Sequence, residues 1–390
     1  MKKTRKIISA LLAAFFFAAA LPAVTVRAEQ FTSTAKAYAL IEANTRQIVA
    51  SENADAKLHA AGLTKLMSYL LFYEALANGK VKSEDSVRVS QEAAKKGGTS
   101  VFLDSGASYS FETLLKPAIV CNANDAVTAL AEHVAGNEAA FVAMMNERAG
   151  ELGLTSTFAD CTGISADSQV SANDLAIIAS ELSKYSGFFK YSCIWLDTFT
   201  HESGRETEMS NSNVLIKNEL YDGMSTGSTP SSGYSAAISA KSGGGRFIAI
   251  VIGDKDTSSR FQLAEELIGY AIASYGVKQI AQQGGKVKTL PVANGNVKEV
   301  GVYAKEDLSI LYKKGEEAGI ATEVQVENLV APLQKGQVVG KILVTTPEGE
   351  ISVALAVDRD VLEQTFSSGL HRLLKGFLGL VSVADQGIMP

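Results

Sequence analysis

The segment His59-Ala60-Ala61-Gly62-Leu63-Thr64-Lys65-Leu66-Met67-Ser68 carries the most information in this chain. Residues three apart on a helix share a face, so a side chain at position 62 would lie beside Lys65. A serine there would pass its proton to the lysine amine and attack a carbonyl carbon. Position 62 holds a glycine, which has no nucleophilic side chain. The segment therefore predicts an active-site helix that has lost its nucleophile.

Several other segments, in their order along the chain, resemble the D-alanyl-D-alanine carboxypeptidases, which are low-molecular-mass penicillin-binding proteins. They are the hairpin 41–49, the triplet 122–124, the run 141–158, the strand 222–229 and the turn 331–337. The resemblance covers nearly the whole chain after its N-terminal segment. It implies a serine peptidase of the β-lactamase and DD-peptidase fold, whose first motif is S-x-x-K. In this comparison Gly62 falls on the nucleophile and Lys65 on its base.

The resemblance also implies that two more reactive groups are missing. The second family motif is S-x-N, and here Asn122 replaces the serine while Asn124 is kept. The third is K-T-G, and here Ser225 replaces the lysine while Thr226 and Gly227 are kept. An amide does not readily exchange a proton at neutral pH, and serine offers a hydrogen bond but no charge. We therefore expect a catalytically inactive relative that keeps a site for a peptidoglycan stem peptide ending in D-Ala-D-Ala.

Three further expectations concern groups around this site. By resemblance, the backbone N–H groups of Gly62 and Ser228 form the oxyanion hole. Arg246 matches a family arginine near the terminal carboxylate of the substrate; the alternative is a strand-edge arginine in solvent. Lys65, which has no serine to activate, would form a salt bridge or a hydrogen bond with Asn124.

Two other functions stay open at the sequence level. The first is an active D-Ala-D-Ala carboxypeptidase with a non-standard nucleophile, for which Cys121, Ser68 and Ser225 are the candidates. The alternative for Cys121 is a small buried cysteine on a helix. The second is a scaffold at the membrane surface, in which the peptidase-like part only bridges partners.

Composition excludes several classes of protein. The chain has 390 residues, of which 46% are hydrophobic and 20% charged, and this suits a soluble globular protein of two domains. The net charge of −6 argues against nucleic-acid binding. Three cysteines, four histidines and the lack of C-x-x-C or H-E-x-x-H spacing argue against a protein-built metal site. We expect no metal and no cofactor.

Both ends of the chain carry membrane-related patterns. Lysines and an arginine precede an apolar stretch at 7–21, which predicts a signal peptide over 1–28, cleaved after Ala28, and an extracytoplasmic protein. The alternative is an uncleaved anchor. Residues 363–381 predict a basic amphipathic helix that binds the membrane surface. The alternative is a helix docked on the chain's own C-terminal domain. Its apolar residues are Phe366, Leu370, Leu373, Leu374, Phe377 and Leu378.

The periodicity predicts the α/β (α+β) class. Residues 30–277 are expected to form a DD-peptidase-like domain, with a central antiparallel sheet flanked by helices. Its strands are expected at 37–41, 47–51, 235–240 and 246–253, and its helices at 66–77, 126–134, 138–152 and 261–275. Residues 288–360 are expected to form a small all-β domain, with strands at 297–303, 308–312, 321–326, 338–346 and 351–357.

Overall fold

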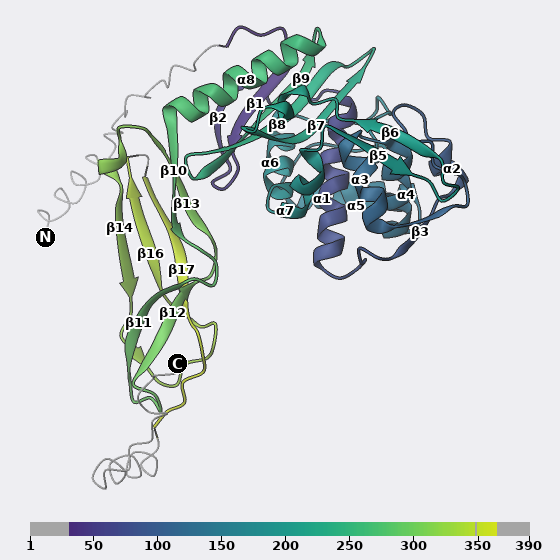
Figure 1. Ribbon diagram of the computed structural model, residues 1–390. Coiled ribbons are helices and arrows are strands. Elements are labelled where there is room, and N and C mark those ends of the chain that lie inside the picture. The colour runs from purple at the N-terminus through teal and green to yellow at the C-terminus, as the bar shows by residue number, and fades with distance from the viewer. Residues whose placement is uncertain (1–30, 348, 365–390) are drawn as a thin grey trace, which may run out of the picture. The chain divides into compact units, whose positions relative to one another are not determined.

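The computed structural model describes residues 31–347 and 349–364 (Figure 1). The expected signal peptide lies outside the described residues, and so does the expected terminal helix apart from its first two positions. Within the described part, no helix is long and apolar enough to cross a membrane.

The first part of the chain is built on a five-stranded antiparallel sheet in the order β2-β1-β9-β8-β7. Its strands come from both ends of this part, as the sequence predicted, because the helices are inserted between them. The strands are β1 (Ala37–Glu42), β2 (Gln47–Glu52), β7 (Tyr221–Thr229), β8 (Gly233–Ser242) and β9 (Gly245–Asp254).

The two faces of the sheet enter different hydrophobic cores, because alternate residues of a strand point to opposite faces. Ala39 and Ile41 of β1 belong to a core with the helices that precede β7. Tyr38 and Leu40 belong to a core with α8 (Thr257–Ser274), which lies across the other face (Figure 1). The sheet is therefore covered on both sides, as expected.

The remaining helices of this part are α1 (Lys65–Ala77), α2 (Gln91–Ala94), α3 (Phe111–Val120), α4 (Asn124–Ala135), α5 (Glu138–Glu151), α6 (Ala172–Leu182) and α7 (Ser186–Ser192). Side-chain caps fix several helix starts, since Ser110, Asn137 and Ser171 each accept a hydrogen bond from an amide in the first turn. Short pieces complete this part: η1 (Ala61–Thr64), η2 (Val214–Lys217), and the strand pairs β3 (Ser86–Arg88) with β4 (Ser108–Ser110) and β5 (Leu196–Thr200) with β6 (Glu206–Ser210).

The second part of the chain is rich in β-strands, as predicted. A six-stranded sheet has the order β14-β16-β17-β12-β11-β15, and β10 pairs with β13. The strands are β10 (Tyr275–Ala281), β11 (Lys286–Ala293), β12 (Glu299–Ala304), β13 (Leu308–Lys313), β14 (Ala321–Val326), β15 (Leu329–Val330), β16 (Val338–Thr346) and β17 (Gly349–Val357), with η3 (Glu317–Gly319) between β13 and β14. The sequence missed β10, which continues directly from α8, and β11.

Candidate active site

Gly62 lies in η1, just before α1, and its backbone faces β7. A Cβ atom built on Gly62 in ideal geometry would lie 2.7 Å from Thr226 O and 3.2 Å from Gly227 Cα. A Cβ atom built on Gly227 would lie 2.3 Å from Gly62 N. Cβ atoms do not approach backbone this closely, so only glycine fits at position 62 while β7 stays where it is. We call this contact between η1 and β7 the η1–β7 seam.

The η1–β7 seam lies at Gly62, one of the two expected donors of the oxyanion hole. Such a hole needs donors about 2.7–3.1 Å from an empty position for the oxygen. Here the backbones of Gly62 and Gly227 are close together, since a Cβ atom built on Gly227 would lie 2.3 Å from Gly62 N. Ser228, the other expected donor, is exposed and pairs with Tyr234 of β8.

Lys65 is the first residue of α1, and its side chain is buried. Its Nζ donates a hydrogen bond of 2.9 Å to Thr162 O. Burial lowers the pKa of Lys65 to about 8, although neighbouring thiol and carboxyl groups act in the opposite direction. The expected partner was Asn124, and this expectation is wrong: the hydrogen bond of Lys65 within the described chain goes to the Thr162 carbonyl, because the loop after α5 reaches it first.

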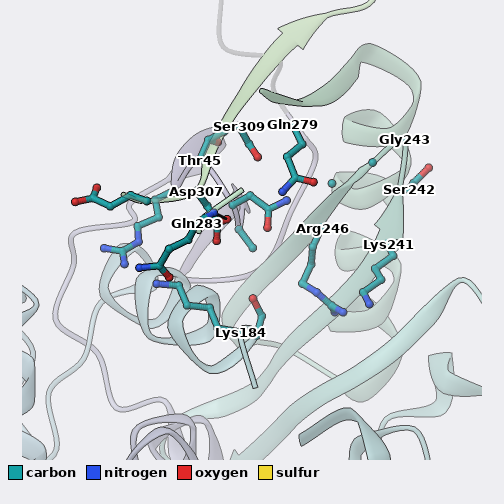
Figure 2. Close-up of a pocket in the computed structure, with 17 residues that line it drawn as sticks. Thr45, Lys184, Lys241, Ser242, Gly243, Arg246, Gln279, Gln283, Asp307 and Ser309 are labelled. Atoms are coloured by element: carbon teal, nitrogen blue, oxygen red, sulfur yellow. Dashed lines mark hydrogen bonds between the residues drawn. The ribbon is translucent and has the colours of Figure 1, made fainter. Parts of the chain in front are cut away.

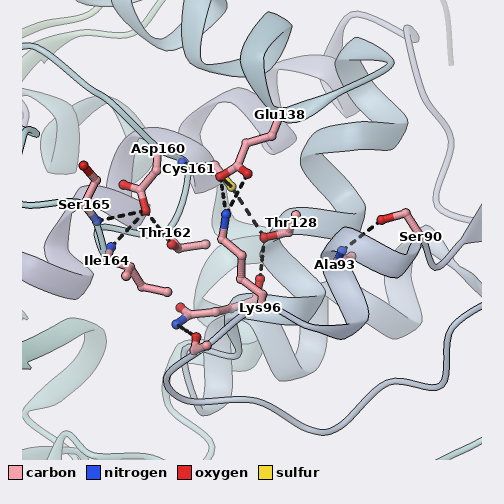
Figure 3. A network of polar contacts seen from close by, with 12 residues as sticks. Ser90, Ala93, Lys96, Thr128, Glu138, Asp160, Cys161, Thr162, Ile164 and Ser165 are labelled. Carbon is pink, nitrogen blue, oxygen red and sulfur yellow. Dashed lines mark hydrogen bonds and ion pairs between the residues drawn. The ribbon is translucent and has the colours of Figure 1, made fainter.

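That loop is held by its own carboxylate (Figure 3). Asp160 accepts hydrogen bonds from the Thr162 hydroxyl (2.7 Å) and from the backbone N–H groups of Gly163 (2.9 Å), Ile164 (2.9 Å) and Ser165 (3.3 Å). Next to it, Glu138 pairs with Lys96 at 2.6 Å and lies 3.2 Å from Cys161 Sγ. The carbonyl that binds Lys65 is thus part of a fixed network.

Asn122 connects α1 to β7. Its φ of 56° is left-handed, a conformation that asparagine tolerates better than most residues. Its Oδ1 accepts hydrogen bonds from the Tyr69 hydroxyl (2.9 Å) and the Ser225 hydroxyl (3.0 Å), and its Nδ2 lies 3.5 Å from Thr226 O. Two of the three altered positions, 122 and 225, therefore bond to each other. Where the resemblance places reactive groups, the structure has a bridge between neutral polar side chains.

The kept residues of the motifs have structural partners. Asn124 Nδ2 donates to Gly97 O at 2.7 Å, while Asn124 Oδ1 is buried without a hydrogen-bond partner among the described residues. Thr226 is buried, and its hydroxyl bonds to that of Ser212. Both side chains are buried.

Arg260 was missed by the sequence reasoning. It lies on α8, is 5% exposed, and its Nη1 donates to Gly227 O (3.2 Å) and Ser235 O (2.9 Å). Burial lowers its pKa to about 10, so it stays charged at neutral pH. It is the cation that contacts the third motif. No local signal marks it, since the contact depends on how α8 packs on β8.

Arg246 does not face the η1–β7 seam, and that expectation is wrong. It pairs with Lys241 of β8, whereas Gly227 pairs with Ser235. These β8 positions are six residues apart, or about 20 Å along a strand. The neighbours of Arg246 are Asp222 Oδ1 (2.7 Å from Nη1), Ser239 Oγ and the Phe189 ring, whose centroid is 3.8 Å from the guanidinium carbon.

The alternative nucleophiles are unsuited to attack. Burial raises the pKa of Cys121 to about 12, and its thiol lies 3.3 Å from Pro117 O, so it is protonated at neutral pH. Ser68 is fully buried and donates to Cys161 O at 2.7 Å. Ser225 is engaged by Asn122. Among residues 31–347 and 349–364, no group of His, Cys, Asp and Glu side chains could hold a metal ion.

Comparison with known proteins decides the family. A family model described as D-alanyl-D-alanine carboxypeptidase matches residues 24–256. The chain belongs to the D-alanyl-D-alanine carboxypeptidase family. A second model, described as the C-terminal domain of penicillin-binding protein 5, matches residues 275–363. These matches confirm the resemblance drawn from the motifs.

Relatives and solved structures of the D-alanyl-D-alanine carboxypeptidase family agree over most of the chain. D-alanyl-D-alanine carboxypeptidase DacF of Bacillus subtilis is 34% identical, over 89% of this chain and 91% of its own length. DacC of Escherichia coli is 33% identical, over 84% of each chain. Penicillin-binding protein 5 from Haemophilus influenzae has a TM-score of 0.71 at 29% identity and covers 86% of this chain and 99% of its own. The fold is therefore the family's DD-peptidase fold with its β-rich C-terminal domain.

Proposed function

We propose that this chain is a catalytically silent D-alanyl-D-alanine carboxypeptidase homologue that acts in the cell envelope by binding rather than by hydrolysis. One observation carries the proposal: a Cβ atom at position 62 would lie 2.7 Å from the Thr226 carbonyl oxygen. The nucleophile is absent, and backbone occupies the space it would need.

The energetic argument follows from covalent catalysis. Acyl transfer through an enzyme ester needs an activated nucleophile. Removing the nucleophile or its base costs about 10⁶-fold in kcat in a well-studied serine hydrolase. The remainder, roughly 10³–10⁴-fold over water, comes from the oxyanion hole and from substrate binding. The η1–β7 seam lies at one of the two expected oxyanion-hole donors, so we expect less than this remainder.

The active-enzyme alternative receives no support from the candidate nucleophiles. The Cys121 thiol is held protonated by burial, and Ser68 is enclosed by α1 and the loop after α5. Ser225 lacks a neighbouring base, because its hydroxyl donates to an amide oxygen.

The place of action is inferred from the ends of the chain and from the family. We propose export through the signal peptide at 1–28 and retention at the outer face of the membrane by the helix at 363–381. In that position the protein would act as a scaffold that contacts peptidoglycan peptides or a protein partner. Of the functions left open by the sequence, a role in binding fits the η1–β7 seam better than catalysis does.

Intact-mass spectrometry after incubation with a β-lactam tests the proposal. We expect no mass increase for the mature chain and no release of D-alanine from a D-Ala-D-Ala peptide. An active D-alanyl-D-alanine carboxypeptidase treated in parallel should gain the mass of one β-lactam. An acyl group mapped by peptide digestion to any residue at the η1–β7 seam would overturn the proposal.

A further inference from the structure

A cavity of about 1260 Å³ lies at the hairpin end of the sheet, away from the η1–β7 seam (Figure 2). It is lined by the turn after β1, the residues after α6, the β8–β9 hairpin, and residues on and near β10 and β13. Val277 N donates to Gly243 O at 3.2 Å, which ties β10 to the hairpin. The lining is mainly polar, with amide, hydroxyl and charged side chains.

Two cations lie directly opposite each other in this cavity. Lys241 and Arg246 are register partners in the β8–β9 hairpin, so their side chains leave the same face of it. Figure 2 shows the two next to one another. Like charges in this arrangement are destabilising. Asp222 offsets the charge of Arg246, but Lys241 has no ion-pair partner within the described chain. The pair is therefore suited to receive an anionic group.

Arg246 is also preorganised for such a group. Its side chain is 6% exposed, stacks on the Phe189 ring, and is anchored through Nη1 by Asp222 and Ser239. Its Nε and Nη2 make no hydrogen bond to any residue that the structure describes. A planar guanidinium with free donors is the side chain best suited to bind a carboxylate.

Carboxylates line another part of the same cavity. Glu306 and Asp307 follow β12, in the turn before β13. Asp307 Oδ1 accepts a hydrogen bond from Gln283 N at 2.8 Å, whereas Glu306 has no ion-pair partner among the described residues. The two other cations of the lining, Arg46 and Lys184, share the single carboxylate of Glu181, so one positive charge of this group is left over. The lining therefore has one excess positive charge at Lys241 and one at the Arg46–Lys184 pair, against the two carboxylates of Glu306 and Asp307 on another segment.

We propose that this cavity binds a short peptide that carries both a carboxylate and a free amino group, with the carboxylate at Lys241 and Arg246 and the ammonium at Glu306 and Asp307. A polyanion would be repelled by the two carboxylates, and an uncharged glycan would leave the opposed charges unused. In the cell wall this chemistry belongs to the peptidoglycan stem peptide, an assignment that rests on the proposed envelope function. The peptide would then bind in this cavity and not at the η1–β7 seam.

Isothermal titration calorimetry of the mature chain with a synthetic stem pentapeptide containing a free diamino-acid amine tests the carboxylate end. Lys241→Gln should weaken binding about tenfold, as the loss of one charge-assisted hydrogen bond does. Lys278→Gln, an exposed β10 lysine outside the lining, is the matched control and should bind as the unmodified chain does.

The ammonium end is tested with the same peptide acetylated on its side-chain amine. Glu306→Gln should weaken binding of the free-amine peptide severalfold and leave binding of the acetylated peptide unchanged. Equal affinity of Lys241→Gln and the unmodified chain, or binding of an N-acetylated sugar oligomer in place of the peptide, would overturn the proposal. β-Lactam acylation reports on catalytic silence alone, so the two proposals can fail independently.

Discussion

Gly62 is the residue on which the chemistry of this protein depends. It has no side chain at the position where the motif predicts the nucleophile, and a Cβ atom there would lie 2.7 Å from the Thr226 carbonyl oxygen of β7. A serine at position 62 would therefore clash with β7. The residues at 122 and 225 would also still differ from the family motifs.

Gly62→Ser should lower the free energy of unfolding by about 1–3 kcal/mol, the usual cost of overpacking, and should not restore acylation by a β-lactam. Gly150→Ser is the control, because a Cβ atom there meets nothing within 4 Å and serine is a better helix former than glycine. Urea denaturation and intact-mass spectrometry measure the two effects. A Gly62→Ser variant that is as stable as the original and becomes acylated would show that β7 moves away easily.

Lys65 is a buried ammonium without a carboxylate on it, and this makes the stability depend on pH. Its pKa is about 8 in the folded chain, against a usual value of 10.5. Below pH 8 both states hold the proton, and the folded state carries the full cost of burying the charge. Between pH 8 and 10.5 the unfolded chain holds more protons, so stability rises with pH.

Lys65→Met should remove this dependence. The difference in unfolding free energy between the variant and the original should change by up to about 3 kcal/mol between pH 7 and pH 10. At pH 7 the variant should have the higher unfolding free energy. This gain should be smaller by roughly 1 kcal/mol, because the Thr162 carbonyl loses its hydrogen-bond donor. Urea denaturation at both pH values measures the difference, and parallel pH profiles would contradict it.

At the scale of elements, the bridge from α1 through Asn122 to β7 holds the η1–β7 seam closed. Asn122 Oδ1 accepts one hydroxyl from each side, from Tyr69 and from Ser225. The substitutions at 122 and 225 are therefore a matched pair: a short serine on β7 leaves room for the longer amide. This is the physical reason to expect that changing one of them alone does not reopen the groove.

A double-mutant cycle of Asn122→Ala and Ser225→Ala should give a coupling energy of about 0.5–1.5 kcal/mol in stability. Alanine is strained at the left-handed φ of position 122. This strain is the same whether residue 225 is serine or alanine, so it cancels from the coupling energy. A cycle of Asn124→Ala with Ser225→Ala is the control and should be additive, because Asn124 bonds to Gly97 instead. Additivity in both cycles would remove the bridge from the explanation.

At the scale of the whole molecule, the chain keeps the fold of its family. The sheet, the helices on both of its faces and the C-terminal strands are those of the carboxypeptidase family. Stability does not require catalysis, since the cores are built from apolar side chains and not from the polar side chains of the motifs. None of the helices that the structure describes is long and apolar enough to cross a membrane.

Removal of residues 365–390 should release the exported protein from membranes into the soluble fraction. The expected helix there supplies an apolar face and basic residues for an anionic surface. Fractionation and immunoblotting measure the distribution. A control variant with Arg372→Gln and Lys375→Gln should weaken attachment mainly at low salt, where the attraction of these charges to an anionic surface is not screened. Unchanged localisation of the truncated chain would contradict the anchor.

The sequence by itself determined the family and the class of fold. Apolar periodicity gave strands β1, β2, β8 and β9 and helices α1, α4, α5 and α8, because local burial follows the period of each element. Reactivity belongs to individual side chains, so the glycine at 62 and the asparagine at 122 could be interpreted from the motifs alone. Strand β10 was missed although the expected helix ended at its first residue, because β10 pairs with β13, which follows only after β11 and β12.

Only the tertiary structure decided which side chains meet. It placed Arg260, not Arg246, at the third motif, gave Lys65 a carbonyl partner, and brought β7 onto Gly62. The contacts of Lys65 and Gly62 join segments more than 90 residues apart in the sequence. All three contacts depend on how helices and strands pack against each other. Local sequence determines whether a segment repeats its buried residues as a helix or as a strand. The orientation and distance of helices and strands relative to each other are determined by close packing of the core that they share.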